Sequence, residues 1–248
     1  MDTMFVGRHF IELKSIDSTN LYALRLIEEK KCFEGTLVSA IEQNSGKGQR
    51  GNHWISNPGE NITASIIFFP SFLSAMQQFN LNKAIAVGVK DFISDFCSED
   101  VKIKWPNDIL VGNKKVAGIL IENILRGNSI SRAVVGIGIN INQTNFTDLP
   151  SASSIKLSTG IDYDITNCIE SLCKHIEKRY LQLKSGSSMI NEEYLKNLYQ
   201  LNKWCIYEVE NKLIKARIKG VSEFGRLIVE YEDGNFKEFD LKELKFVL

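Results

Sequence analysis

The amino-acid sequence predicts an α+β domain built on an antiparallel sheet, followed by a small SH3-like β-barrel. Two tight-turn dipeptides between apolar runs, Gly112-Asn113 and Gly127-Asn128, predict consecutive hairpins, which pair their strands antiparallel. Helical patterns follow, and after Trp204 the chain changes to short β-type segments separated by turn signals. We therefore expect a large domain over residues 1–202 and a compact one over residues 203–248.

The N-terminal part of the chain predicts three strands and one helix. Residues 8–16 partly alternate apolar and polar side chains, and residues 36–42 and 61–69 are rich in β-branched and other apolar residues. Between the first two strands, Ser18 or Thr19 is a natural N-cap for a helix whose apolar residues recur at helical spacing.

The middle of the chain predicts a helix, a short strand and the hairpins. A four-residue apolar rhythm from Leu81 to Phe96 indicates an amphipathic helix. Residues 101–105 alternate apolar residues with lysine and should form a half-buried strand that stops at Pro106, because proline cannot donate to a sheet. The turn dipeptides then join three strands, at 109–111, 116–124 and 130–141.

Two more helices should precede the C-terminal module. The first covers 165–183 and ends near Gly186, and the second runs through about 188–201. Within the module, Asp233-Gly234 is a strong hairpin signal.

The composition of the 248 residues excludes several classes of function. Thirty basic residues balance thirty acidic ones, so no net field recruits nucleic acid or an anionic membrane. No signal peptide begins the chain and no apolar run is long enough to span a bilayer, so a cytoplasmic location is expected. The five cysteines are scattered without a C-x-x-C pair, which argues against a disulfide framework or a zinc site.

Four segments carry residues whose chemistry suggests a ligand, each with a purely structural alternative. Residues 17–20 either cap a helix or line a site. Residues 45–54 combine three glycines with Lys47 and Arg50, which suits phosphate binding or a flexible basic loop. Residues 107–108 follow a proline-terminated strand and offer oxygen ligands for Mg²⁺ and a nucleotide, or form a plain turn.

The fourth segment is the lysine-headed strand that begins at Lys114. Lys115 can present its ammonium group to a phosphate, or it can be solvated charge at a hairpin end. In the next strand, Gly136 and Gly138 indicate a bulge or a close backbone contact.

The order of these segments resembles the biotin–protein ligase family. The motifs are D-S-T-N at 17–20, E-Q-N-S-G-K-G-Q-R-G-N-H-W at 42–54, K-W-P-N-D at 104–108, K-V-A-G-I-L-I-E at 115–122 and G-I-G-I-N at 136–140. The resemblance covers essentially the whole chain, and K-W-P-N-D followed by K-x-A-G-I-L-x-E is a highly specific pair. It implies a mixed, largely antiparallel sheet backed by helices, of the class II synthetase-like type, joined to an SH3-like domain.

The resemblance also implies an activity and a set of site residues. The enzyme would use ATP and Mg²⁺ to convert biotin to biotinyl-5′-AMP and would then transfer biotin to a lysine of a biotin carboxyl carrier protein. Lys115 and Lys47 would be the catalytic cations. The implied biotin contacts are Ser18, Thr19, Asn20, Gln43, Gly46, Lys47, Gly48, Gln49, Lys115 and Gly118. The implied ATP contacts are Arg50, Trp54 near the adenine, Asn107, Asp108 and Asn140, with Asp108 also on Mg²⁺.

The glycine-rich loop departs from the family pattern, which is usually G-R-G-R-x-G-R-x-W. Lys47 keeps a charge in place of the first arginine, whereas Gln49 and Asn52 are neutral amides. The electrostatic grip on a phosphate should therefore be weaker, unless Arg50 compensates.

Further expectations concern partners and rival functions. The strand at residue 8 leaves no room for an N-terminal winged helix-turn-helix, so no repressor role or DNA binding is expected. We expect no membrane partner, no zinc or redox cofactor, and a monomer or weak homodimer. The rival functions are a lipoate–protein ligase, a non-catalytic biotin-adenylate sensor and, more weakly, a nucleic-acid binder.

Overall fold

The computed structural model describes residues 1–147 and 149–247, except for the side chain of Arg50. A seven-stranded sheet with the order β1-β2-β3-β7-β6-β5-β4 forms its centre. Of its neighbouring strands, β1 and β2 pair in parallel and the other pairs are antiparallel, which confirms the predicted largely antiparallel, mixed sheet. The strands are β1 (Phe10–Ile16), β2 (Leu37–Gln43), β3 (Asn61–Phe68), β4 (Val101–Lys104), β5 (Asp108–Val111), β6 (Lys114–Arg126) and β7 (Ser129–Asn140).

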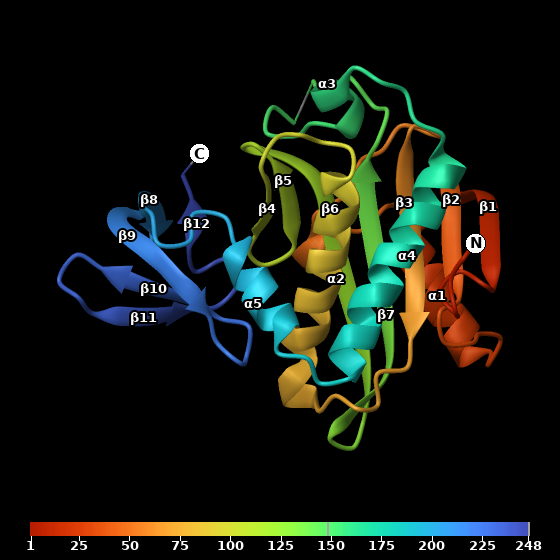
Figure 1. Cartoon of the computed structure of the whole chain (residues 1–248), viewed down its shortest axis with the longest axis horizontal. Coiled ribbons are helices and arrows are strands. Elements are labelled where there is room, and N and C mark those ends of the chain that lie inside the picture. Colours follow the sequence, from red (N-terminus) through yellow and green to blue (C-terminus); the bar gives the residue numbers. More distant parts are fainter. Residues whose placement is uncertain (148, 248) are drawn as a thin grey trace.

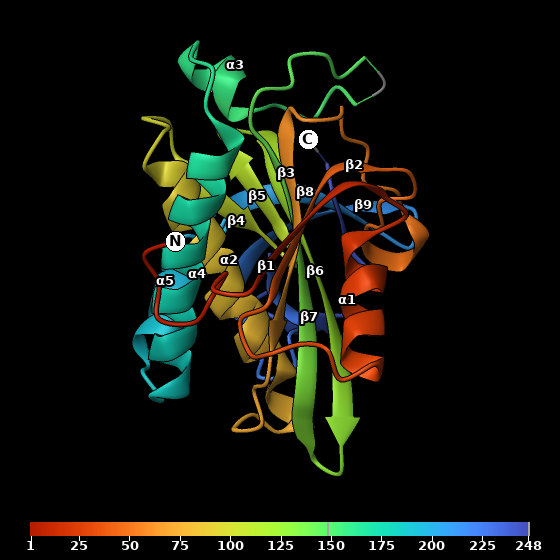
Figure 2. The ribbon, with the colours of Figure 1, turned by 90° about the vertical axis from the view of Figure 1, so that its right-hand side faces the viewer.

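Helices cover both faces of this sheet (Figures 1 and 2). Helix α1 (Thr19–Glu28) lies alone on one face, where it connects the parallel strands β1 and β2. On the other face lie α2 (Gln78–Ser94), α4 (Ile165–Lys184) and α5 (Met189–Lys196). Three short helices complete the domain, η1 (Gln49–Gly51), η2 (Ala75–Gln77) and α3 (Ile155–Thr159). No described helix is long and apolar enough to cross a membrane.

The main core fills the space between the sheet and helices α2 and α4. Ile85 and Phe92 of α2, Ile139 of β7 and Ile176 of α4 are all fully buried there. Since the predicted helical rhythm ran through Ile85, Val89 and Phe92, the apolar stripe read from the sequence is the buried face of α2.

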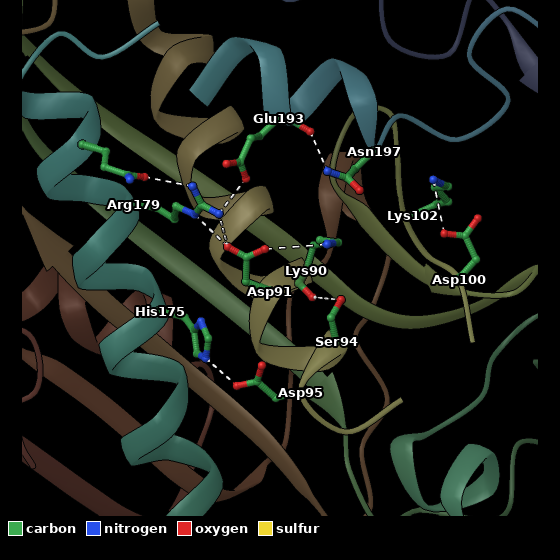
Figure 3. Close-up of polar contacts among 11 residues, drawn as sticks. Lys90, Asp91, Ser94, Asp95, Asp100, Lys102, His175, Arg179, Glu193 and Asn197 are labelled. Atoms are coloured by element: carbon green, nitrogen blue, oxygen red, sulfur yellow. Dashed lines mark hydrogen bonds and ion pairs between the residues drawn. The ribbon is translucent and has the colours of Figure 1, made fainter. Parts of the chain in front are cut away.

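A buried arginine joins the three helices on this face (Figure 3). Arg179 of α4 is 6% exposed and donates from Nε to Asp91 of α2 at 2.7 Å. Its Nη2 donates to Glu193 of α5 at 2.6 Å. Because two carboxylates accept from one guanidinium, α2, α4 and α5 are tied by charge as well as by packing.

The last predicted helix is shorter than expected. Helix α5 ends at Lys196, not near residue 201. The reason is a backbone pairing with strand β4, in which Ile103 N–H donates to Asn197 O at 2.9 Å and Tyr199 N–H donates to Ile103 O at 2.8 Å. A segment paired with a strand in this way cannot also continue the helix.

The C-terminal residues form a separate antiparallel sheet with the order β11-β10-β9-β8-β12. Its strands are β8 (Trp204–Val209), β9 (Lys212–Val221), β10 (Leu227–Tyr231), β11 (Phe236–Phe239) and β12 (Lys245–Phe246). Antiparallel pairing agrees with an SH3-like module, but the described residues form no closed barrel. β12 contains only two residues and pairs with β8, while β11 pairs with β10.

The two sheets meet at the end of β4. The indole Nε1 of Trp105 donates to the carbonyl of Gly225 at 2.8 Å, and the Lys104 ammonium lies 4.9 Å from the Phe246 ring centroid. Gly225 has φ +85°, and a Cβ there would lie 2.5 Å from the Phe79 ring. Only glycine therefore fits this contact between the C-terminal sheet and Phe79 of α2.

Candidate functional site

A cavity of about 180 Å³ opens on the face of the sheet that carries α1. Residues of α1, β2, the glycine-rich loop, β3 and β5–β7 line it. They are Ser18, Thr19, Asn20, Gln43, Lys47, Gly48, Gln49, Asn52, His53, Trp54, Ala64, Asn107, Asp108, Lys115, Gly118, Ile119, Leu120, Gly136, Ile137 and Gly138. Segments distant in the sequence thus converge on one space.

The floor of the cavity is made by two rows of residues across the sheet. In the first row Asp108 of β5 pairs with Gly118, which pairs with Gly138 of β7. In the second row Leu120 pairs with Gly136. Residues two apart on a strand share a face, so both rows lie under the cavity. The glycines leave room there for side chains from α1 and from the glycine-rich loop.

The start of α1 supplies a polar wall. Ser18 occupies the N-cap position, as predicted, but its side chain makes no capping hydrogen bond. Instead the Gln43 side chain of β2 accepts from Thr19 N–H at 2.8 Å and lies 3.1 Å from the Thr19 hydroxyl. Gln43 thereby satisfies one of the open N–H groups of the helix, and the Ser18 hydroxyl stays available.

The opposite side of the cavity carries charge. Lys115 Nζ lies 2.6 Å from Asp108 Oδ1, with the two side chains 36% and 22% exposed. Asn107, beside Asp108, donates from its amide nitrogen to Ile119 O at 2.7 Å, which holds the turn after Pro106 against β6. A cation and a carboxylate therefore stand together at the mouth of the cavity.

A β-bulge aims Lys115 into this space. Ile109 pairs with Ala117, whereas Leu110 pairs with Lys115, so β6 carries one extra residue, Val116. Residues 115 and 118 are three apart and would point to opposite faces of a regular strand. Because of the extra residue, the side chain of Lys115 points to the same face as position 118. In agreement, a Cβ at Gly118 would lie 3.3 Å from Lys115 Nζ.

The glycine-rich loop forms a small hairpin over the cavity. Lys47 bridges to His53, Gly48 N–H donates to Asn52 O at 2.8 Å, and Trp54 N–H donates to Gly46 O at 2.9 Å. Gly46 is buried at the base of the hairpin, where a Cβ would lie 2.6 Å from Trp54 O.

Trp54 anchors this hairpin on the glycines of the floor. A Cβ at Gly138 would lie 2.4 Å from the indole, and one at Gly118 would lie 3.2 Å from it. The close backbone contact predicted for Gly138 is therefore present. The Trp54 indole N–H is buried and has no hydrogen-bond partner among the described residues. The Lys115 ammonium lies 5.7 Å from the ring centroid.

Known proteins share these segments. Residues 12–140 match the biotin/lipoate A/B protein ligase family, and this match covers more than half of the chain. The chain belongs to this family.

Relatives of this ligase family are similar to the chain over different lengths. A bifunctional ligase/repressor BirA of Bacillus spizizenii is 34% identical over 186 residues, which are 73% of this chain and 56% of that protein. A biotin–[acetyl-CoA-carboxylase] ligase of Paracoccus denitrificans is 35% identical over 132 residues, 52% of this chain and 53% of that protein. The chain thus spans little more than half the length of these relatives.

A solved structure of the same family matches the whole fold. The biotin protein ligase from Aquifex aeolicus, in complex with biotin and ATP, has a TM-score of 0.79 and 26% identity. The match covers 96% of this chain and 98% of that one, so it includes the C-terminal sheet.

Most residues that the family resemblance implied lie together in the cavity. The exceptions are Gly46, which supports the hairpin, and Asn140, which does not line the cavity. Asn140 is buried at the end of β7, donates to Ser153 O at 2.9 Å and has an amide oxygen without a partner among the described residues. The side chain of Arg50 lies outside what the structure describes.

The remaining reactive groups have no place in the site. All five cysteines are free thiols, and burial raises the pKa of Cys168 to about 11 and that of Cys173 to about 12. Cys168 and Cys173 are thus poor nucleophiles. The described residues contain no group of three or more His, Cys, Asp or Glu side chains that could hold a metal ion.

Proposed function

We propose that the chain is a biotin–protein ligase, which joins biotin to AMP and then to a lysine of an acceptor protein. One observation carries this proposal. A closed polar wall from Ser18 to Gln43 faces, across one cavity, the cation of Lys115 and the carboxylate of Asp108. Such a cavity can hold a polar ring at one end and a carboxylate beside a nucleotide phosphate at the other.

The polar wall favours biotin over lipoate, the other substrate of the family. Biotin carries a cyclic urea, with two N–H donors and a carbonyl acceptor, whereas the dithiolane of lipoate forms no strong hydrogen bonds. Thr19 and Asn20 are each 3% exposed and Ser18 is 1% exposed. Thr19 and Asn20 are already hydrogen-bonded to Gln43, Ser65 and Glu122, so what they offer a ligand is their remaining lone pairs, to which a dithiolane would bring no donor. The two relatives and the Aquifex structure are named as biotin ligases or BirA, which supports the same choice.

In the first step, the biotin carboxylate oxygen attacks the α-phosphorus of ATP. The bond from that phosphorus to the β-phosphate oxygen breaks, and pyrophosphate leaves. Both reactants are anions, so cations are needed where negative charge gathers on the α-phosphate. We assign this role to Lys115 at the mouth of the cavity and to Lys47 on the loop above it.

The nucleotide would lie against the charged side. Asn107 and Asp108, at the turn after Pro106, would contact ATP, and the unpartnered Trp54 N–H offers a donor to a ligand atom. Magnesium commonly binds through one or two carboxylates together with phosphates and water. Asp108 fits that requirement as a single carboxylate, and Mg²⁺ there would reduce the charge repulsion between the phosphates and biotin. Arg50 and Asn140 remain proposed contacts of the nucleotide.

In the second step, a lysine amine of the acceptor attacks the biotinyl carbonyl. An amide bond forms, AMP leaves and the amine loses a proton. We propose a biotin carboxyl carrier protein as the acceptor. The hairpin of the glycine-rich loop lies over the cavity, where it would shield the mixed anhydride from water until the acceptor arrives.

The test is incubation of the protein with ATP, Mg²⁺, biotin and a carrier domain, followed by the mass of the carrier. We expect one biotinyl group per carrier, and biotin-dependent pyrophosphate release without any carrier. Pyrophosphate release with lipoate but not with biotin would mean that the substrate is lipoate. Tight binding of biotinyl-5′-AMP without turnover would instead indicate a non-catalytic sensor.

A further inference from the structure

Asn20 lines the cavity, and two residues outside the lining, Ser65 and Glu122, hydrogen-bond to its side chain. Its side chain rests over Gly136, where a Cβ would lie 2.3 Å from Asn20 Oδ1. Gly136 pairs with Ser65 of β3 on one side and with Leu120 of β6 on the other. The Asn20 side chain therefore packs on a row of paired residues from β3, β7 and β6. Any residue other than glycine at position 136 would occupy the space that Asn20 fills.

Groups that can only accept hydrogen bonds surround one end of the Asn20 amide. Its Nδ2 donates to Glu122 Oε2 at 2.7 Å and lies 3.4 Å from the carbonyl oxygen of Leu120. A carboxylate and a peptide carbonyl have no proton to give. The NH₂ group of Asn20 must therefore face β6, because its oxygen would be repelled there.

A hydroxyl holds the other end of the amide. Ser65 is fully buried, and its Oγ lies 2.6 Å from Asn20 Oδ1 and 2.8 Å from Thr19 Oγ1. The Ser65 hydroxyl donates, and its shorter contact is to Asn20 Oδ1, whereas the Thr19 hydroxyl donates to Gln43 Oε1 at 3.1 Å. Ser65 therefore supplies the donor for the Asn20 oxygen.

This arrangement sets the hydrogen-bonding character of the polar wall. The carbonyl oxygen of Asn20 has a second lone pair. Because the Thr19 hydroxyl donates its proton to Gln43 Oε1, Thr19 Oγ1 also presents a lone pair. Two neighbouring acceptors suit a ring with N–H donors, such as a cyclic urea. If the amide of Asn20 were turned round, an N–H would face an N–H.

We propose that Glu122 and Ser65 are positioning residues that keep the Asn20 oxygen turned toward the substrate ring. Neither residue lines the cavity, and both act through Asn20. The inference rests on the proposed function, since it assigns the donor groups of the biotin ring to this wall. It adds that the preference for a ring with N–H donors is set from outside the cavity.

Substitutions at Glu122 test the proposal because they change the polarity of one position. Glu122→Gln still offers an acceptor, Glu122→Leu offers nothing, and Glu122→Lys offers only donors. We expect the KM for biotin to stay within about twofold of wild type for Gln and to rise several-fold for Leu. For Glu122→Lys we expect the KM for biotin to rise about tenfold or more, because the lysine ammonium would attract Asn20 Oδ1 and turn the amide over. The kcat and the KM for ATP should change little throughout.

Two further measurements distinguish a positioning role of Glu122 and Ser65 from a purely structural one. Ser65→Ala should also raise the KM for biotin several-fold, because the Asn20 oxygen loses its donor. Biotin methylated on a ureido nitrogen has lost one N–H donor. The wild-type protein should therefore bind it much more weakly than it binds biotin, whereas the Glu122→Lys protein should discriminate far less between the two compounds. Glu12→Lys carries the same charge change on the exposed part of β1 and is the matched control.

The outcomes distinguish this inference from the proposed function. If wild type releases no pyrophosphate with biotin, the proposed function fails. If wild type is active but the Lys, Leu and Gln variants share one KM for biotin, Glu122 sets no polarity and the inference is overturned. If Glu122→Lys and Ser65→Ala both lower kcat and thermal stability but leave the KM for biotin unchanged, the two residues serve folding alone.

Discussion

Replacement of Lys115 by alanine is expected to slow adenylation about 10²-fold while leaving the fold intact. Lys115 pairs with Asp108 at 2.6 Å, but both side chains are partly exposed, at 36% and 22%. A pair with this exposure contributes at most about 1 kcal/mol to folding, because water screens it. Loss of a cation that faces developing charge costs about 3 kcal/mol of transition-state stabilisation, which lowers the rate about 10²-fold.

The assay is biotin-dependent pyrophosphate release in a single turnover, run beside urea unfolding. Lys114→Ala is the matched control, because Lys114 is the exposed neighbour in the same hairpin. We expect the control to adenylate biotin at the wild-type rate and both variants to unfold within about 1 kcal/mol of wild type. A Lys115→Ala protein that releases pyrophosphate within about threefold of the wild-type rate would refute the role assigned to this lysine.

Three more substitutions probe other parts of the molecule. Gly138→Ala should lower activity at least about tenfold, because its Cβ would lie 2.4 Å from the Trp54 indole and displace the loop; steady-state kinetics at unchanged thermal midpoint would show it. Arg179→Met should destabilise the protein by about 2–3 kcal/mol, since two carboxylates lose their shared donor; urea unfolding measures this, and a change below about 0.5 kcal/mol would contradict it. Gln49→Arg should slow the escape of biotinyl-5′-AMP several-fold by adding about 1 kcal/mol of charged hydrogen bonding; an unchanged release rate after dilution would mean that another cation already holds the phosphate.

The sequence predicted the elements well where local signals were strong. The turn dipeptides at Gly112 and Gly127 are the hairpin turns, with φ of +58° and +60°. Pro106 follows the end of β4 as expected. The end of α5 was predicted wrongly because Asn197 and Tyr199 pair with Ile103, and pairing across about ninety positions leaves no local signal.

The site was predictable as a list of residues but not as an arrangement. The motifs named the lining side chains because their chemistry is unusual for a core. Ser65 and Glu122 were missed, although Thr63 and Ser65 are polar residues in a strand that is buried throughout. These two polar residues in an otherwise apolar strand were the available signal. To interpret it, one would have had to know that α1 lies over β3.

The bulge at Val116 constrains how this part of the protein can change in length. Loss of Val116 would restore a regular strand and leave Lys115 two residues from Gly118, so the lysine would still point to the cavity. A slip in register that removed the bulge without a deletion would instead turn Lys115 to the face that carries α2 and α4. We infer that chains descended from this one can lose Val116 and keep the cation in the cavity, but cannot keep all four residues from 115 to 118 in a regular strand.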